Sequence, residues 1–162
     1  MKSLVAYASK TGTTRECAEA LAKLLPECDL CDLNREKPDP NPYDIVVVGS
    51  CVRAGALQPA MREYLENCEP ILLKKTLGVY ICCVSDSSAD KYIQSGISPT
   101  LLAHSETAAF GGKLDPSAAK GFDRLILKTL AKLAANGDDE SSFHPERIPE
   151  FAEKLLQRAE KA

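Results

Sequence analysis

The sequence has no long hydrophobic run and no basic segment, and each absence excludes a class of protein. No apolar run among the 162 residues approaches the roughly 18 residues that a transmembrane helix requires. The formal net charge is −3, and no dense stripe of Lys and Arg could neutralise phosphates, so nucleic acid is not expected as a partner. The start of the chain is too short in apolar residues for a signal peptide. We therefore expect a cytoplasmic protein with no transmembrane segment.

Three common phosphate-binding signatures are also missing. The sequence contains neither a G-x-x-x-x-G-K-[ST] loop nor a G-x-G-x-x-G turn. A phosphatase loop needs an Arg six residues after a Cys at the end of a strand, whereas Cys51 is followed by Arg53. Any phosphate site in this chain must therefore be built in another way.

Cysteine, in contrast, is abundant, with seven residues. Without an export signal, the expected state is reduced thiols. Cys28 and Cys31 form a C-x-x-C, but no second pair has the spacing of metal ligands, and residues three apart on a strand point to opposite faces. We expect structural thiols and no metal site.

Strand and helix patterns alternate along the chain. Continuous short apolar runs are typical of parallel strands that are buried on both faces. The predicted strands are residues 4–8, 28–33, 45–49, 77–84 and 107–110. The predicted helices are residues 13–25, 57–68, 122–133 and 148–159, while residues 85–106 are weakly helical around Pro99. This alternation predicts a doubly wound α/β fold, as a single domain over residues 1–162.

A hydroxyl-rich loop separates the first predicted strand from the first predicted helix. In doubly wound folds, ligands bind beyond the carboxyl ends of the strands. A loop that enters a helix there collects backbone N–H groups at the positive end of the helix dipole, which favours phosphate. One helix cap needs one hydroxyl, whereas this loop has four, so phosphate binding is the stronger interpretation. The loop consists of Ser9, Lys10, Thr11, Gly12, Thr13 and Thr14.

The same loop resembles the Ser/Thr-x-Thr-Gly-x-Thr segment of the flavodoxin family, which holds the phosphate of FMN. The resemblance implies a five-stranded parallel sheet in the order 2-1-3-4-5 with helices on both faces. It also implies that FMN is the cofactor and that redox partner proteins dock over the exposed edge of the flavin.

A second loop is predicted over residues 49–55, where flavodoxins contact the flavin ring. Gly55 would permit a peptide movement near the ring. The Arg53 guanidinium would favour the anionic reduced flavin and raise its potential, although a solvent-exposed Arg at a loop tip is an equally good interpretation. The residues of this loop assigned to the cofactor are Ser50, Cys51, Val52, Arg53, Ala54 and Gly55.

A third loop follows the predicted strand over residues 77–84. By resemblance, Ser85, Asp86 and Ser87 supply N–H and C=O groups to the pyrimidine edge of the flavin. Asp86 and Asp90 have an alternative role as caps of the following helix.

The sequence departs from typical flavodoxins in its aromatic residues. It contains no Trp, the second loop has no aromatic side chain, and Tyr92 is the nearest candidate after the third loop. Flavodoxins usually stack aromatic rings on the flavin, so the resemblance does not extend to tight stacking.

Later segments resemble a particular branch of the family, which includes the menaquinone-dependent protoporphyrinogen dehydrogenases. These segments are residues 50–55, 109–114, 122–126 and 149–152. In that branch a quinone or a porphyrinogen is the substrate. The segment over residues 85–106 carries Lys91 as its only Lys or Arg and resembles the basic insert of those enzymes poorly.

Three functions therefore stay open, in descending order of support. The first is an FMN-binding electron carrier, the second is an FMN-dependent dehydrogenase of the protoporphyrinogen type, and the third is a non-redox module that binds another phosphate ligand. No acid–base pair suggests a catalytic residue: His104 is interpreted as a surface side chain, and His144 as part of the loop before the last helix.

Overall fold

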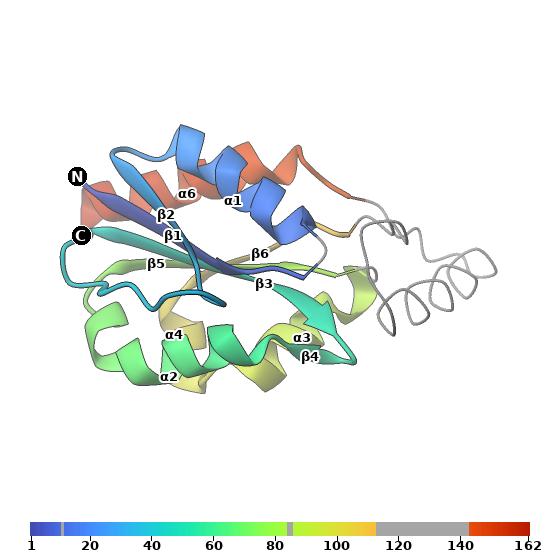
Figure 1. Cartoon of the computed structure of the whole chain (residues 1–162). Coiled ribbons are helices and arrows are strands. Elements are labelled where there is room, and N and C mark those ends of the chain that lie inside the picture. Colours follow the sequence, from blue (N-terminus) through green and yellow to red (C-terminus); the bar gives the residue numbers. More distant parts are fainter. Residues whose placement is uncertain (11, 84–85, 113–142) are drawn as a thin grey trace.

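A parallel β-sheet forms the centre of the protein (Figure 1). The computed structural model describes residues 1–10, 12–83, 86–112 and 143–162. Five strands lie in the order β2-β1-β3-β5-β6, which is 2-1-3-4-5 when only the parallel strands are counted. The predicted fold class and strand order are thus confirmed. The parallel strands are β1 (Ser3–Ala8), β2 (Cys28–Asp32), β3 (Ile45–Arg53), β5 (Thr76–Cys82) and β6 (Glu106–Ala109).

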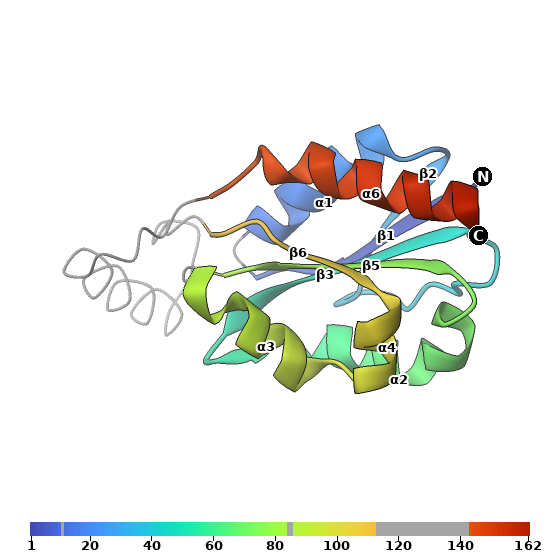
Figure 2. The ribbon, with the colours of Figure 1, turned by 180° about the vertical axis from the view of Figure 1, so that it is seen from behind.

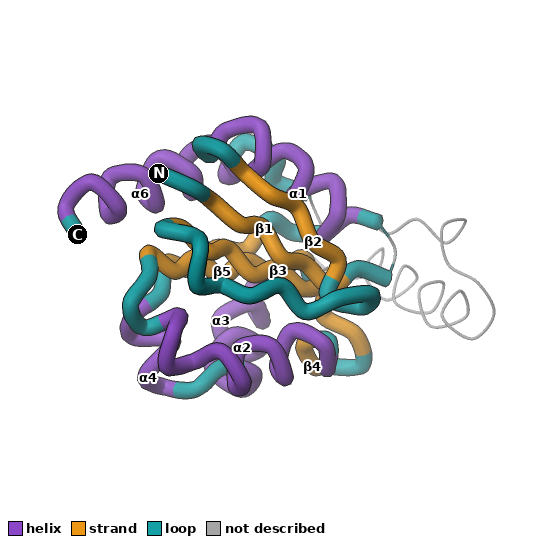
Figure 3. Tube along the Cα trace, turned by 60° about the vertical axis from the view of Figure 1, so that its left-hand side comes forward, coloured by secondary structure: helices purple, strands orange, loops and turns teal. Residues whose placement is uncertain are grey.

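Helices cover both faces of the sheet, as the front and back views show (Figures 1 and 2). The tube view shows the sheet between the two helical layers (Figure 3). The predicted helix over residues 122–133 lies outside the described residues. One layer contains α1 (Thr13–Leu24) and α6 (Arg147–Lys161), and the other contains α2 (Pro59–Leu72), α3 (Ala89–Gly96) and α4 (Pro99–His104).

Alternate residues of each central strand feed two separate cores. On β3, Val46 and Val48 pack into the core on the α2 side, whereas Ile45 and Val47 pack on the α1 side. All four are fully buried, as expected for strands covered on both faces. The parallel pairing of β1, β3 and β5 places their carboxyl ends at one edge of the sheet, beside the start of α1.

Tyr80 links the sheet to the first turn of α1. Its ring is fully buried and lies across Gly49, the residue opposite it on β3. A Cβ added to Gly49 would overlap the ring, so only glycine leaves the space that the ring occupies. The Tyr80 hydroxyl donates a hydrogen bond of 2.8 Å to the carbonyl oxygen of Thr14. The position of α1 therefore depends on a glycine in the middle of a neighbouring strand.

The prediction of a loop over residues 49–55 is wrong for its first part, because β3 continues to Arg53. Ser50 and Cys51 pair with β5, and beyond them the strand turns back in a hairpin with β4 (Ala56–Leu57). Ala54 and Gly55 form its two-residue turn with φ of 49° and 75°, and hairpins favour such positive φ values because they match the strand twist. Most of the predicted loop is therefore part of a β-hairpin formed by β3 and β4.

Replacing Gly49 with Ala is expected to destabilise the protein. The added methyl group must displace the Tyr80 ring, and overpacking of this kind costs about 1–3 kcal/mol. Tyr80→Phe is the companion variant, since it keeps the ring and removes only one hydrogen bond, worth about 1 kcal/mol. Urea unfolding monitored by circular dichroism measures both. A Gly49→Ala protein as stable as the wild type would contradict this packing.

Candidate functional site

The candidate site lies at the carboxyl edge of the sheet, where β1 leads into α1. Gly12 is the N-cap of α1, with φ of 98°, and no described side chain accepts a hydrogen bond there. The Ser9 hydroxyl instead accepts from the Gly12 N–H at 3.1 Å, which folds the loop back on itself. Among the described residues, no Ser or Thr side chain therefore caps α1 in the ordinary way. The first N–H groups of α1 are left for another acceptor.

The loop also leaves room for a ligand. A Cβ built on Gly12 meets no described atom within 4 Å, so the backbone can be approached closely. The Asn34 side chain donates to the Ser9 carbonyl oxygen at 3.3 Å and ties the loop to the end of β2. No motif in the sequence pointed to Asn34. Lys10 is exposed beside this loop, and Thr11 lies outside the described residues.

Thr14 carries a buried hydroxyl that lacks a good hydrogen-bond partner among the described residues. The residue is 1% exposed, and its Oγ1 has no hydrogen bond of normal geometry with the described residues. Its polar neighbour is the Cys82 thiol, a weak acceptor. A hydrogen bond with Cys17 and burial raise the pKa of Cys82 well above its usual range, and the Thr14 hydroxyl lowers that pKa in part. A buried hydroxyl without a good partner costs free energy, so a ligand oxygen at this place would be stabilised. The other buried unpaired hydroxyl, on Ser3, is at the far end of β1.

In the second predicted loop, the hydroxyl of Ser50 is engaged in hydrogen bonds within the protein. Ser50 is fully buried, accepts a hydrogen bond from the Gln58 N–H at 3.0 Å and donates to the Cys51 carbonyl at 2.9 Å. These bonds fix the base of the hairpin. Val52 pairs with Leu57 in the hairpin, which leaves Ala54 and Gly55 exposed at its tip. The assignment of these residues to a cofactor stays a prediction.

Two cationic residues bring their charge close to Cys51, which links the first two loops. Burial raises the pKa of the Cys51 thiol, while the backbone N–H of Lys10 and the charges of Arg53 and Lys10 act to lower it. Charges from both loops therefore act on the Cys51 thiol. This edge of the sheet combines a helix N-terminus with positive side chains, an arrangement that favours a bound anion.

The third predicted loop is described in part. Ser85 lies outside the described residues, and residues Asp86–Ser88 form a short 3-10 turn before α3. The N-cap of α3 is Ser88, without a side-chain capping bond, and Asp90 lies in the first turn of the helix and not at the cap. Tyr92 packs partly against the core on the α2 side.

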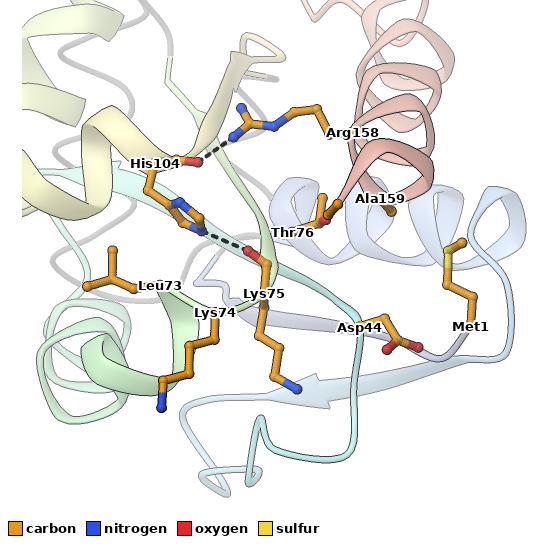
Figure 4. A pocket seen from close by; sticks show the side chains of 10 residues that line it. Met1, Asp44, Leu73, Lys74, Lys75, Thr76, His104, Arg158 and Ala159 are labelled. Atoms are coloured by element: carbon orange, nitrogen blue, oxygen red, sulfur yellow. Dashed lines mark hydrogen bonds between the residues drawn. The ribbon is translucent and has the colours of Figure 1, made fainter.

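A cavity lies at the opposite edge of the sheet from the candidate site (Figure 4). It has a volume of about 680 Å³, and its lining residues Lys75, His104 and Arg158 make structural hydrogen bonds. His104 Nε2 lies 2.8 Å from the Lys75 carbonyl oxygen, and Arg158 donates to the His104 carbonyl at 2.6 Å. These contacts join α4, α6 and the residue that precedes β5. His144 precedes α6 and lies 3.0 Å from a Glu146 oxygen.

Among the described residues, no group of three or more His, Cys, Asp or Glu side chains is arranged to hold a metal ion. Within the same part of the chain, no helix combines the length and apolar character needed to span a bilayer.

The chain belongs to the flavodoxin domain family, whose sequence pattern it matches over residues 4–142. It is 24% identical to protoporphyrinogen IX dehydrogenase [quinone] of Escherichia coli K12, over 86% of this chain and 83% of that protein. Its fold is similar to that of a short-chain flavodoxin associated with a non-canonical PDU bacterial microcompartment, with a TM-score of 0.57, 18% identity and coverage of 98% and 99% of the two chains. A mutant flavodoxin of Fusobacterium nucleatum bound to flavin mononucleotide gives a TM-score of 0.52 at 12% identity, with coverage of 98% and 97%.

The unpaired hydroxyl predicts an unusual effect of Thr14→Val in the absence of any ligand. Val has nearly the same shape, and it removes a buried oxygen whose burial costs about 1–3 kcal/mol when unpaired. The ligand-free variant is therefore expected to be more stable than the wild type in urea unfolding. Thr107→Val, on the edge strand β6, is the control and should change the free energy of unfolding little. A clear loss of stability in Thr14→Val would show that the hydroxyl has a partner within the protein.

Proposed function

We propose that the chain forms one FMN-binding domain over residues 1–162 and acts as an electron-transfer protein. The observation that carries this proposal is the first turn of α1, which combines backbone N–H groups without a capping side chain and a buried, unpaired Thr14 hydroxyl at the carboxyl edge of a doubly wound sheet. A phosphate group satisfies both kinds of donor at once. Membership of the flavodoxin family supports FMN as the compound that brings this phosphate.

Different segments of the chain contact different parts of the cofactor in this proposal. The N–H groups at the start of α1 and the hydroxyls of Thr13 and Thr14 hold the phosphate. The tip of the β3–β4 hairpin offers backbone groups to the ring, and its open Gly55 admits a ligand close to the chain. The segment with Ser85, Asp86 and Ser87 is assigned to the pyrimidine edge. When bound, FMN accepts and releases electrons, and the protein supplies binding, orientation and charge.

An electron carrier is the first candidate, with partner proteins docking at the exposed ring edge. The segment that would distinguish the dehydrogenase supports this choice. In α3 the one cation is Lys91, and the apolar residues Ala89 and Ile93 are buried in the core. The described part of this segment therefore presents no basic amphipathic face to a membrane. A cytoplasmic location stays a prediction.

An FMN-dependent dehydrogenase is the second candidate. The observation that favours it is the 24% identity with the quinone-linked protoporphyrinogen IX dehydrogenase over most of both chains. A quinone or a porphyrinogen would then replace the partner protein as the group that exchanges electrons with FMN. Binding of a different phosphate compound, without redox chemistry, is the third.

Thr14→Val should weaken FMN binding while leaving riboflavin binding unchanged. A charge-assisted hydrogen bond to phosphate is worth about 1.5–3 kcal/mol, so the dissociation constant for FMN should rise about tenfold or more. Lys10→Gln should have a smaller effect because Lys10 is exposed. Isothermal titration calorimetry measures both ligands. Equal weakening of FMN and riboflavin would place the Thr14 hydroxyl away from the phosphate.

Arg53→Ala should make the potential of the step that produces fully reduced flavin more negative. Fully reduced flavin carries negative charge at neutral pH, and a nearby guanidinium stabilises that charge. Because Arg53 is partly exposed, added salt should shrink the difference. Arg62→Ala removes a cation from the surface of α2 and is the control. Spectroelectrochemistry at low ionic strength decides, and identical potentials for wild type and Arg53→Ala would refute the role.

Measuring the turnover of protoporphyrinogen distinguishes an electron carrier from a dehydrogenase. With protoporphyrinogen and a menaquinone analogue under anaerobic conditions, we expect no oxidation that depends on FMN. The same preparation should accept electrons rapidly from a low-potential reductase. The protein stripped of FMN is the control for both reactions. FMN-dependent turnover of about 1 s⁻¹ or faster, the usual range for enzymes, would place the dehydrogenase first.

A further inference from the structure

Three cysteine side chains lie together beneath the candidate phosphate loop. The Sγ atoms of Cys17 on α1 and Cys82 on β5 are 3.8 Å apart, and both residues are buried. Cys51 on β3 is the direct neighbour of Cys82 in the parallel ladder. Paired residues on adjacent strands project to the same face of a sheet, so Cys51 also faces the α1 layer. Three separate elements thus bring one thiol each to this place.

The three thiols differ in how accessible they are. Cys17 is 0% exposed and Cys82 is 5% exposed, whereas Cys51 is partly exposed at the base of the hairpin. The backbone N–H of Lys10 and the charges of Arg53 and Lys10 act on Cys51, although burial has the larger effect and raises the pKa of its thiol. Reactive cysteines are typically partly exposed and close to positive charge. A small oxidant from solvent therefore meets Cys51 before it meets the other two.

We propose that Cys51, Cys82 and Cys17 form an oxidant-sensitive modification site, in which a hydroperoxide reacts at Cys51 and the product is a Cys17–Cys82 disulfide. Cys51 sulfur attacks the peroxide, the O–O bond breaks, and Cys51 sulfenic acid and water form. Cys82 sulfur then attacks Cys51 sulfur, an S–S bond forms, and the S–O bond breaks with loss of water. Cys17 sulfur attacks Cys82 sulfur and returns the Cys51 thiol. Overall, two thiols lose two electrons and two protons, and hydrogen peroxide becomes two molecules of water.

The final disulfide would act directly on the phosphate loop. Cys17 lies three residues after Thr14, so the two share one face of α1. Closing the sulfur–sulfur gap from 3.8 Å to a bond of about 2.05 Å pulls the first turns of α1 toward β5. The Tyr80 hydrogen bond to the Thr14 carbonyl lies in the same turn. Oxidation should therefore disturb the phosphate donors, an effect that rests on the proposed FMN function.

Mapping of disulfides by mass spectrometry tests the chemistry on the full chain. After hydrogen peroxide treatment, we expect a Cys17–Cys82 peptide pair that disappears with dithiothreitol. Cys51→Ser should slow its formation about tenfold or more, because the accessible thiol is lost. Cys17→Ala should instead trap a Cys51–Cys82 pair. The control Cys68→Ser removes a partly exposed thiol from α2, on the other side of the sheet, and should change nothing.

Two results would overturn the proposal: a Cys17–Cys82 bond that forms at the same rate in Cys51→Ser, or oxidation that joins other cysteines instead. The effect on the cofactor is measured separately. The oxidised wild type should bind FMN about tenfold more weakly than the reduced protein, and dithiothreitol should restore the affinity. Because disulfide mapping needs no flavin, a reduced protein that binds no FMN would contradict the proposed function and leave the thiol chemistry tested on its own.

Discussion

The contact between Tyr80, Gly49 and Thr14 fixes the part of the protein on which the site depends. The ring of Tyr80 fills the space above Gly49, and its hydroxyl holds the carbonyl of Thr14 in the first turn of α1. A helix N-terminus binds an anion only when its N–H groups point at one place. Here the direction of those groups is set by a buried aromatic ring on β5 and by the absence of a side chain on β3. A single pair of strand residues therefore orients the candidate phosphate site.

The proposed site uses backbone and hydroxyl donors where other phosphate sites use lysine or glycine-rich signatures. This choice agrees with the sequence, which lacks those signatures and carries a net charge of −3. Lys10 and Arg53 lie around the site and not within the first turn of α1, so their charges modulate a bound anion more than they hold it. The division suits a redox cofactor, because the phosphate anchors the molecule while the hairpin and its Arg53 influence the ring.

Much of the fold could be predicted from periodicity, and the exceptions have local physical causes. The buried run over residues 45–49 correctly predicted a central parallel strand, since both faces are covered. Its extension to Arg53 was missed because Cys51, Val52 and Arg53 are not a continuous apolar run, and their pairing depends on β4, a strand of two residues. The packing of Tyr80 over Gly49 and the hydrogen bond from Asn34 to Ser9 could not be predicted from the sequence. Both contacts join segments that are distant along the chain. The hydroxyl-rich loop could be recognised in the sequence. Only the structure shows that no described side chain caps α1 at Gly12.

We propose that this edge of the sheet binds one redox-active FMN. The most direct measurement is the visible absorption spectrum of the purified protein, supplied with FMN and freed of excess, during stepwise anaerobic reduction. We predict flavin bands that correspond to one FMN per chain, bleach on reduction and return on reoxidation. A protein that retains no flavin after incubation, and whose spectrum does not change during reduction, would contradict the account.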